Sequence, residues 1–202
     1  MTMTMTPFVD AHCHVNFAAF QGDYKEVISR AHAAGVFLVN VGTQKDTSLR
    51  AVEMAHEFPS GVYATVGIHP IHTDASHHDA EELGVSQIHA EEGQRSSALS
   101  QRGSAPRGLM SRAEEFDFEY YKKLAMDDVV VAIGECGLDY YRLKLKVESC
   151  KLKQKEVFEE HIRLAAEIKK PLMIHCRDAY ADLIEILSTF PSTPSSGPRG
   201  NF

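Results

Sequence analysis

The stretch VVVAIGECGL, residues 129–138, decides the fold. Its apolar residues are nearly continuous and several are β-branched, which favours an extended strand. Strands buried on both faces of a parallel sheet have this pattern, whereas strands with one face in water alternate between apolar and polar residues. We therefore expect a strand of a parallel sheet here.

Four further runs have the same character, and helical patterns lie between the runs. The runs are FVDAHCH from Phe8, VFLVNVG from Val36, VYATVGIH from Val62 and PLMIHCR from Pro171. Apolar residues repeat at intervals of three and four after the first, second, fourth and fifth runs, around Ile28, Val52, Ile162 and Leu183. Asp178 is placed to cap the last of these helices. Strands that alternate with helices predict an α/β fold with a parallel sheet.

One interval, between the third and fourth runs, is too long for a single βα unit. The excess lies in residues 74–115, which are rich in Gly, Ser, Gln and Arg. This composition predicts a flexible surface insertion. A loop without function and a lid over a substrate both remain open for it.

Composition excludes several classes of protein. The 202 residues, 44% hydrophobic and 24% charged, suit a single globular domain over residues 1–202. The sequence has no apolar run of the ~20 residues that span a bilayer and no signal peptide, so we expect a cytoplasmic protein without a membrane segment. Four scattered cysteines predict reduced thiols. A net charge of −7 excludes a broad basic surface for duplex nucleic acid, although bound metal ions could still supply a local positive field. No obligate protein partner is evident.

Polar residues with metal-binding chemistry occur where the predicted strands end. They are His12, His14, His69, Glu135 and His175. In a parallel barrel these ends meet on one face, and residues two apart on a strand point the same way. Imidazole suits zinc and other transition metals, and a carboxylate can bridge two ions about 4 Å apart. The coincidence of these residues at equivalent ends predicts a metal site.

Each residue also has a simpler interpretation. An isolated HxH pair is more often two surface histidines, and His175 could be an interior histidine that is only hydrogen-bonded. His69 could contact substrate, bind metal or hydrogen-bond within its loop. Arg177 could contact a phosphate, or form an ion pair with Asp178 or Glu135.

For the other residues of interest near these runs, the sequence predicts only where their side chains lie. We expect Asp139 to line the mouth of the site. Three cysteines, Cys13, Cys136 and Cys176, should point away from it into the packing behind. The histidines of the loop-like region should be solvated: His72, His77, His78 and His89.

Four motifs together resemble one known family, the TatD-type metal-dependent deoxyribonucleases of the amidohydrolase superfamily. They are FVDAHCHV, VGIHP, VVAIGECGLDYY and PLMIHCRDA, in that order. The resemblance implies part of a TIM-type (β/α)8 barrel, with about five βα units present. It also implies one or two divalent ions, such as Mg, Zn or Mn, and hydrolysis of phosphodiester bonds in DNA, often as an exonuclease. It makes His12, His14, Glu135 and His175 metal ligands and places His69 near the substrate phosphate.

The family pattern continues further than this sequence does. The resemblance implies another histidine ligand on a sixth strand and a catalytic aspartate on an eighth, and both positions fall beyond Phe202. For these 202 residues alone we expect an open sheet edge, an incomplete metal site, and low stability or association. The alternatives are a small-molecule amidohydrolase or lactonase on the same barrel, and a non-catalytic remnant that binds an ion or partner.

Overall fold

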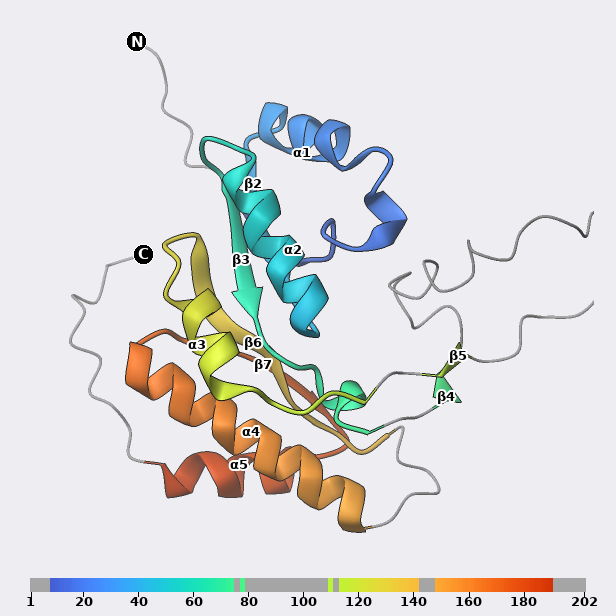
Figure 1. Ribbon diagram of the computed structural model, residues 1–202, viewed down its shortest axis with the longest axis vertical. Helices are drawn as coiled ribbons and strands as arrows, with labels where there is room; N and C mark the ends of the chain where they lie inside the picture. The colour runs from blue at the N-terminus through green and yellow to red at the C-terminus, as the bar shows by residue number, and fades with distance from the viewer. Residues whose placement is uncertain (1–7, 75–76, 79–108, 111–112, 142–147, 191–202) are drawn as a thin grey trace, which may run out of the picture.

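Five parallel strands form the main sheet of the computed structural model, which describes residues 8–74, 77–78, 109–110, 113–141 and 148–190 (Figure 1). The strands are β1 (Phe8–Cys13), β2 (Val36–Val41), β3 (Val62–Val66), β6 (Val130–Asp139) and β7 (Leu172–Arg177), in this order across the sheet. Every neighbouring pair is parallel. The prediction of five parallel strands is confirmed: four strands lie within the predicted runs, and β6 extends one residue beyond its run, to Asp139.

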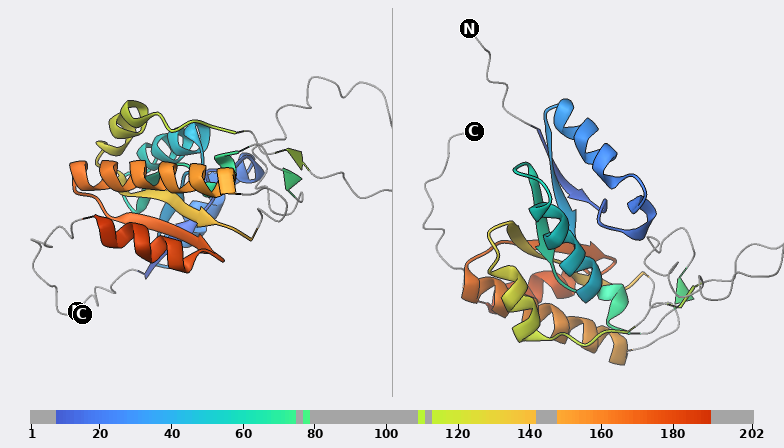
Figure 2. Two further views of the ribbon diagram at one scale, coloured as in Figure 1. Left: turned by 90° about the horizontal axis from the view of Figure 1, so that it is seen from below. Right: turned by 45° about the horizontal axis from the view of Figure 1, so that its top comes forward.

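Helices connect the strands and pack against the outside of the curled sheet (Figure 2). They are α1 (Tyr24–Ala33), α2 (Lys45–His56), α3 (Phe118–Ala125), α4 (Glu148–Ile168) and α5 (Tyr180–Thr189), with single turns η1 (Ala18–Phe20) and η2 (Pro70–His72). Helix α2 packs mainly on β3, and helix α4 mainly on β6. The curvature brings the carboxyl ends of the strands to one side, as a partial barrel requires.

The largest apolar core lies between the middle of the sheet and helices α2, α3 and α4. Its fully buried members include Ala51, Val66, Tyr121, Ile133 and Leu164. Nine of the ten residues of β6 are buried. Burying a Leu or Ile side chain contributes about 2 kcal/mol, so this core fixes β6 firmly.

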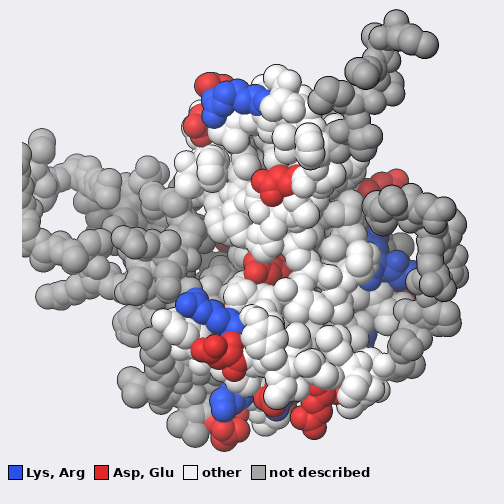
Figure 3. Space-filling model, turned by 180° about the vertical axis from the view of Figure 1, so that it is seen from behind, with Lys and Arg blue, Asp and Glu red and all other residues white. Residues whose placement is uncertain are grey.

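Strand β1 was expected to be buried on both faces, but most of its residues are exposed. Phe8 and Val9 are 69% and 56% exposed. The reason is position, because β1 is the first strand of the sheet and pairs only with β2 among the described strands. At the other end of the sheet, Ile174 of β7 is 40% exposed. Both outer strands of the described sheet thus expose apolar side chains, in agreement with the expected open edge. Seen from behind, uncharged surface separates scattered charged side chains (Figure 3).

Two helix starts differ from the sequence prediction. Asp178 does not cap α5: the N-cap is Ala179, which makes no side-chain cap bond. Asp178 lies one residue before the N-cap and has a φ of 56°, in the left-handed region, which is not the backbone conformation typical of an N-cap residue. Helix α3 was not predicted; it begins after Asp117, whose carboxylate accepts a hydrogen bond from the Tyr120 amide at 3.1 Å.

Most of the predicted insertion, residues 74–115, lies outside the described residues. Within it, β4 (His77–His78) and β5 (Leu109–Met110) pair in antiparallel fashion. Near its end, the Glu114 carboxylate accepts a hydrogen bond from the Tyr121 hydroxyl at 2.8 Å. None of the helices in the described ranges combines the length and apolar character needed to cross a membrane.

Candidate metal centre

The two histidines of the HxH motif face the same space. Their Nε2 atoms are 3.3 Å apart. The His14 Nδ1 lies 3.1 Å from the Val41 carbonyl oxygen, so Nδ1 carries the hydrogen and Nε2 keeps its lone pair. The His12 Nε2 lies 3.3 Å from Oε2 of Glu135. The structure thus places both imidazoles on one side of β1, beside the carboxylate of β6.

The other oxygen of Glu135 faces a second pair of histidines. Its Oε1 lies 3.2 Å from Nδ1 of His175 and 3.6 Å from Nε2 of His69. Two groups, His12–His14–Glu135 and His69–Glu135–His175, each have potential ligand atoms within 4.8 Å of one another. Glu135 therefore lies between two clusters and belongs to both.

The hydrogen bonds of His69 argue against a role as metal ligand. Its Nδ1 accepts a hydrogen bond from the backbone N–H of Ile71 at 3.2 Å. A neutral imidazole that accepts at Nδ1 carries its hydrogen on Nε2. Burial lowers the pKa of His69 to about 3, so the ring is neutral at pH 7. The Nε2–H group is consequently a donor directed into the site.

Asp139 lies behind His175 rather than in an open mouth. Its carboxylate is 1% exposed, and Oδ2 is 3.0 Å from Nε2 of His175. A carboxylate on one ring nitrogen fixes the orientation of an imidazole and directs the other nitrogen outward. Here the other nitrogen, Nδ1, is directed at Glu135.

The charges of the site are strongly coupled to one another. Burial opposes ionisation of Glu135, but hydrogen bonds with His12 and His175 outweigh it and hold the pKa of Glu135 well below its usual range. Burial also disfavours the charged form of His175, but Asp139 and Glu135 outweigh it and raise its pKa to about 9. Without a metal, a proton on His175 balances two buried carboxylates. A cation between the carboxylate and the imidazoles would replace that proton.

Helix α4 supports the site through His161, which precedes Ile162 in the helix predicted after the fourth run. His161 is fully buried, and its Nε2 accepts a hydrogen bond from the backbone N–H of Ile68 at 2.9 Å. Its Nδ1 lies 2.7 Å from the Val157 carbonyl oxygen, to which it donates. The residue that precedes His69 is thus tied to α4.

Gln154, two turns earlier on α4, ties two further segments of the site together. Its Oε1 accepts a hydrogen bond from the Asp139 amide at 2.9 Å. Its Nε2 donates to the carbonyl oxygens of Pro70 and Asp139, each at 3.2 Å. His161 and Gln154 could have been found from the sequence, because each is a polar side chain on the apolar face of an amphipathic helix. An unpaired polar group there would be costly to bury.

Strand β6 approaches β7 very closely next to the site. Gly137 has a φ of 135°, and a Cβ added there would lie 2.1 Å from the backbone oxygen of His175. Glycine permits this contact because it lacks a side chain. The contact sets the distance between the strands that carry Glu135 and His175.

The other residues considered from the sequence lie around this centre. The Arg177 guanidinium is 3.7 Å from the centre of the Tyr141 ring, so its substrate role stays a prediction. The expectation that His72 is solvated is wrong: it is 6% exposed, because η2 packs against β6. The side chains of His77, His78 and His89 lie outside the described residues.

The cysteines lie behind the site, as expected from strand alternation. Cys136 is fully buried in the apolar cluster with Phe158, and Cys176 packs against the same cluster. Cys13 packs in the cluster around Ile28. Burial raises the pKa of Cys13 to about 11 and that of Cys136 further, so both thiols are protonated at pH 7. They do not provide a nucleophile.

The donor set suits one or two divalent ions. Neutral imidazole and carboxylate are the ligands that zinc, manganese and related ions share in hydrolases. A carboxylate with a ligand group on each oxygen is the arrangement that a bridged pair of ions requires.

A family profile described as TatD related DNase matches residues 9–197. The chain belongs to this family. It is 35% identical over 179 residues to YabD of Bacillus subtilis, named an uncharacterized metal-dependent hydrolase, with 88% of this chain and 54% of that protein covered. It is 31% identical over 179 residues to a Yersinia pseudotuberculosis protein named 3'-5' ssDNA/RNA exonuclease TatD, with 88% and 53% covered.

Solved structures of the family show the same fold. The TatD homolog YjjV of Escherichia coli matches with a TM-score of 0.58 and 23% identity, covering 90% of this chain and 55% of that one. A TatD family hydrolase of Entamoeba histolytica matches with a TM-score of 0.61 and 20% identity, covering 91% and 54%. The predicted α/β fold, part of a TIM-type barrel, is confirmed. The chain spans about half the length of the relatives it matches.

Proposed function

We propose that this chain supplies the metal-binding part of a divalent-metal-dependent hydrolase. The hydrolase would cleave phosphodiester bonds in DNA, as an exonuclease on single strands. The observation that carries the proposal is Glu135, whose two oxygens face separate groups of histidines, one lying 3.3 Å from His12 and the other 3.2 Å from His175. The family membership and the name of the Yersinia relative, a 3'-5' ssDNA/RNA exonuclease, support the choice of substrate.

The residues divide into ligands and positioning groups. His12, His14 and Glu135 would hold one ion, and Glu135 with His175 would contribute to a second. The imidazole-rich set favours Zn or Mn over Mg, although all three are candidates. A divalent ion bound there would lower the pKa of a bound water and offset negative charge on phosphoryl oxygens.

The protein's own groups would bind and orient the substrate. The Nε2–H of His69 is suited to donate to a phosphate oxygen, and Arg177 is proposed to contact a phosphate from the end of β7. Asp139 keeps His175 in its orientation. The catalytic aspartate expected beyond residue 202 remains a prediction. A cytoplasmic location also remains a prediction, and the four free cysteines suit a reducing compartment.

Replacing Glu135 by Gln tests the proposal. Gln keeps the shape but lacks the charge, so we expect metal affinity to fall by about 100-fold or more, measured by calorimetry with Mn2+ and Zn2+. The matched control is Glu156→Gln, the same change at an exposed position of α4, which should bind like the unmodified chain.

In the protein extended to include the expected catalytic aspartate, cleavage of 5'-labelled single-stranded DNA should depend on added metal and be lost in Glu135→Gln but not in Glu156→Gln. Unchanged metal binding in Glu135→Gln would overturn the assignment of the centre. Metal binding through Glu135 without cleavage of DNA, RNA, lactones or phosphate esters would instead support the non-catalytic alternative.

A further inference from the structure

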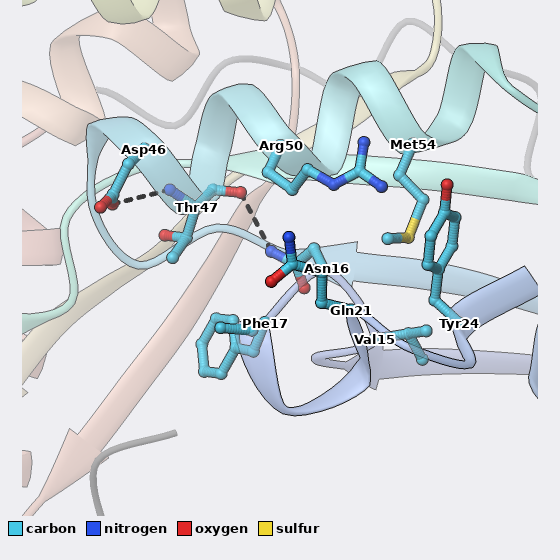
Figure 4. A pocket seen from close by; sticks show the side chains of 10 residues that line it. Val15, Asn16, Phe17, Gln21, Tyr24, Asp46, Thr47, Arg50 and Met54 are labelled. Carbon is cyan, nitrogen blue, oxygen red and sulfur yellow. Dashed lines mark hydrogen bonds between the residues drawn. The ribbon is translucent and has the colours of Figure 1, made fainter. Parts of the chain in front are cut away.

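A cavity of about 450 Å³ lies beside the metal centre, between the segment that follows β1 and helix α2 (Figure 4). Phe17 lines this cavity, and its ring stacks on the His14 ring with 4.3 Å between centres. The cavity therefore shares a wall with the metal centre. Its volume falls in the range of sites for small organic ligands.

The lining of the cavity combines aromatic rings with amide groups. Phe17 and Tyr24 lie on either side, and the amides of Asn16 and Gln21 lie between them (Figure 4). Met54 adds a buried apolar surface. A planar heterocycle suits such a lining, because its faces are apolar and its edge carries hydrogen-bonding groups.

Asn16 gives this cavity a chemical preference. The residue is 5% exposed, and its Nδ2 donates to the carbonyl oxygens of Val41 and Thr47 at 3.1 and 3.0 Å. Turning the amide over would lose both bonds, so the orientation is fixed. Its Oδ1 is buried and has no hydrogen-bond partner in the part of the chain that the structure describes. Because Asn16 lines the cavity, an N–H group of a ligand seated there could satisfy this acceptor.

We propose that this cavity binds the base of a nucleotide, with an amino group of the base directed at Asn16. The choice of a nucleobase rests on the proposed function, since a phosphodiester at the metal centre brings an attached base next to Phe17. Stacking on Phe17 would hold the face of the base, as aromatic side chains do for single strands. The hydrogen bond to Asn16 would favour bases that carry an amino group.

Binding of free nucleosides to the whole chain in EDTA tests this site without metal or hydrolysis. The probes are 2'-deoxyadenosine, purine 2'-deoxyriboside, which lacks the amino group, and 2-deoxyribose 5-phosphate, which lacks the base. By calorimetry or ligand-observed NMR, we expect deoxyadenosine to bind about fivefold more tightly than purine deoxyriboside, the value of one ordinary hydrogen bond. The sugar phosphate should not bind.

Two neighbouring alanines of η1 provide a matched pair of variants. Ala18 lines the cavity, whereas Ala19 is exposed and outside its lining. Ala18→Leu should fill the space and weaken deoxyadenosine binding by at least about tenfold, and Ala19→Leu should bind like the unmodified chain. Circular dichroism checks folding, and the comparison of nucleosides needs no variant.

Absence of nucleoside binding, equal binding of the two nucleosides, or unchanged binding in a folded Ala18→Leu would overturn the proposal. Failure of the proposed function is a separate outcome, because it is measured by metal binding and cleavage in Glu135→Gln. Loss of the base site with an intact metal response would overturn this inference alone.

Discussion

Strands β1 and β6 bring residues of the same site together from opposite surroundings. His12 of β1 and Glu135 of β6 are 3.3 Å apart, yet their side chains are 44% and 10% exposed. β6 has β3 and β7 as neighbours and is covered by α4, whereas β1 pairs only with β2 in the described sheet. The same centre is thus built from a strand fixed by packing and a strand open to solvent.

This difference in burial predicts that substitutions on the two strands have different effects on folding and on metal binding. Substitutions around β6 should act on folding and binding together, because the carboxylate is held by backbone contacts and buried hydrogen bonds. Substitutions on β1 should act mainly on binding, because little of the core depends on its side chains.

The largest effect is expected for Gly137→Ala in β6. A Cβ there would lie 2.1 Å from the His175 oxygen, and the φ of 135° disfavours any side chain. We expect a loss of at least about 3 kcal/mol in the free energy of unfolding, measured with urea. Gly22→Ala, in the turn after β1 where nothing lies within 4 Å of the added atom, should change it by less than about 0.5 kcal/mol. Equal effects at the two positions would contradict the comparison.

The sequence was informative about the fold for a physical reason. Continuous apolar runs mark strands in a parallel sheet, and all five were found at their observed places. Exposure of β1 was not predicted from its own residues, because Phe8 and Val9 are as apolar as residues of a covered strand and only the place of β1 at the end of the described sheet leaves them open. Short helix α3 was missed because its charged and aromatic residues, FEYYKKLA, bury only one narrow face.

For the site, the sequence indicated which residues meet but not what holds them. Chemistry and strand position brought His12, His14, Glu135 and His175 together. The supports, His161 and Gln154, come from α4 and act through backbone groups of Ile68 and of Pro70 and Asp139. The contacts with Ile68 and Pro70 depend on helix placement over more than 80 residues of sequence, which no local pattern specifies.

The second prediction concerns His161, which supports the packed side of the site. Burial lowers its pKa to about 4, below the ~6.5 of an unfolded histidine. The unfolded chain therefore takes up a proton as the pH falls below 6.5 while the folded protein does not, and stability is lost down to about pH 4. This one group should remove about 3 kcal/mol over that range. Buried His69 acts in the same direction.

His161→Leu should show both parts of this role. At pH 7 we expect a loss of about 2 kcal/mol, because the Ile68 N–H loses its buried acceptor. Between pH 6.5 and 4.5 the variant should lose less stability than the unmodified protein, because the histidine that titrates only in the unfolded state is gone. Urea unfolding at both pH values measures this. A pH dependence as steep as that of the unmodified protein would contradict the assignment.

The smallest effect on stability is expected for His12→Gln on the open strand. Because this side chain is 44% exposed, the metal-free protein should lose less than about 0.5 kcal/mol at pH 7. His175→Gln, its counterpart on the packed side, should lose about 2 kcal/mol, because Asp139 and Glu135 lose a charged partner. That contribution of His175 is present below pH 6.5 and disappears as the pH rises through its folded pKa of about 9.

Added metal should reveal a contribution of His12 to binding that the metal-free protein does not show. An ion present at 100 times its Kd stabilises a binding-competent protein by about 2.7 kcal/mol. His12→Gln should lose most of this gain, since it removes a ligand while leaving the fold intact. Thermal melting with and without Mn2+ or Zn2+ measures the gain directly. If His12→Gln kept the full metal-induced shift in melting temperature, His12 would not be a ligand and the proposed role of β1 in metal binding would be wrong.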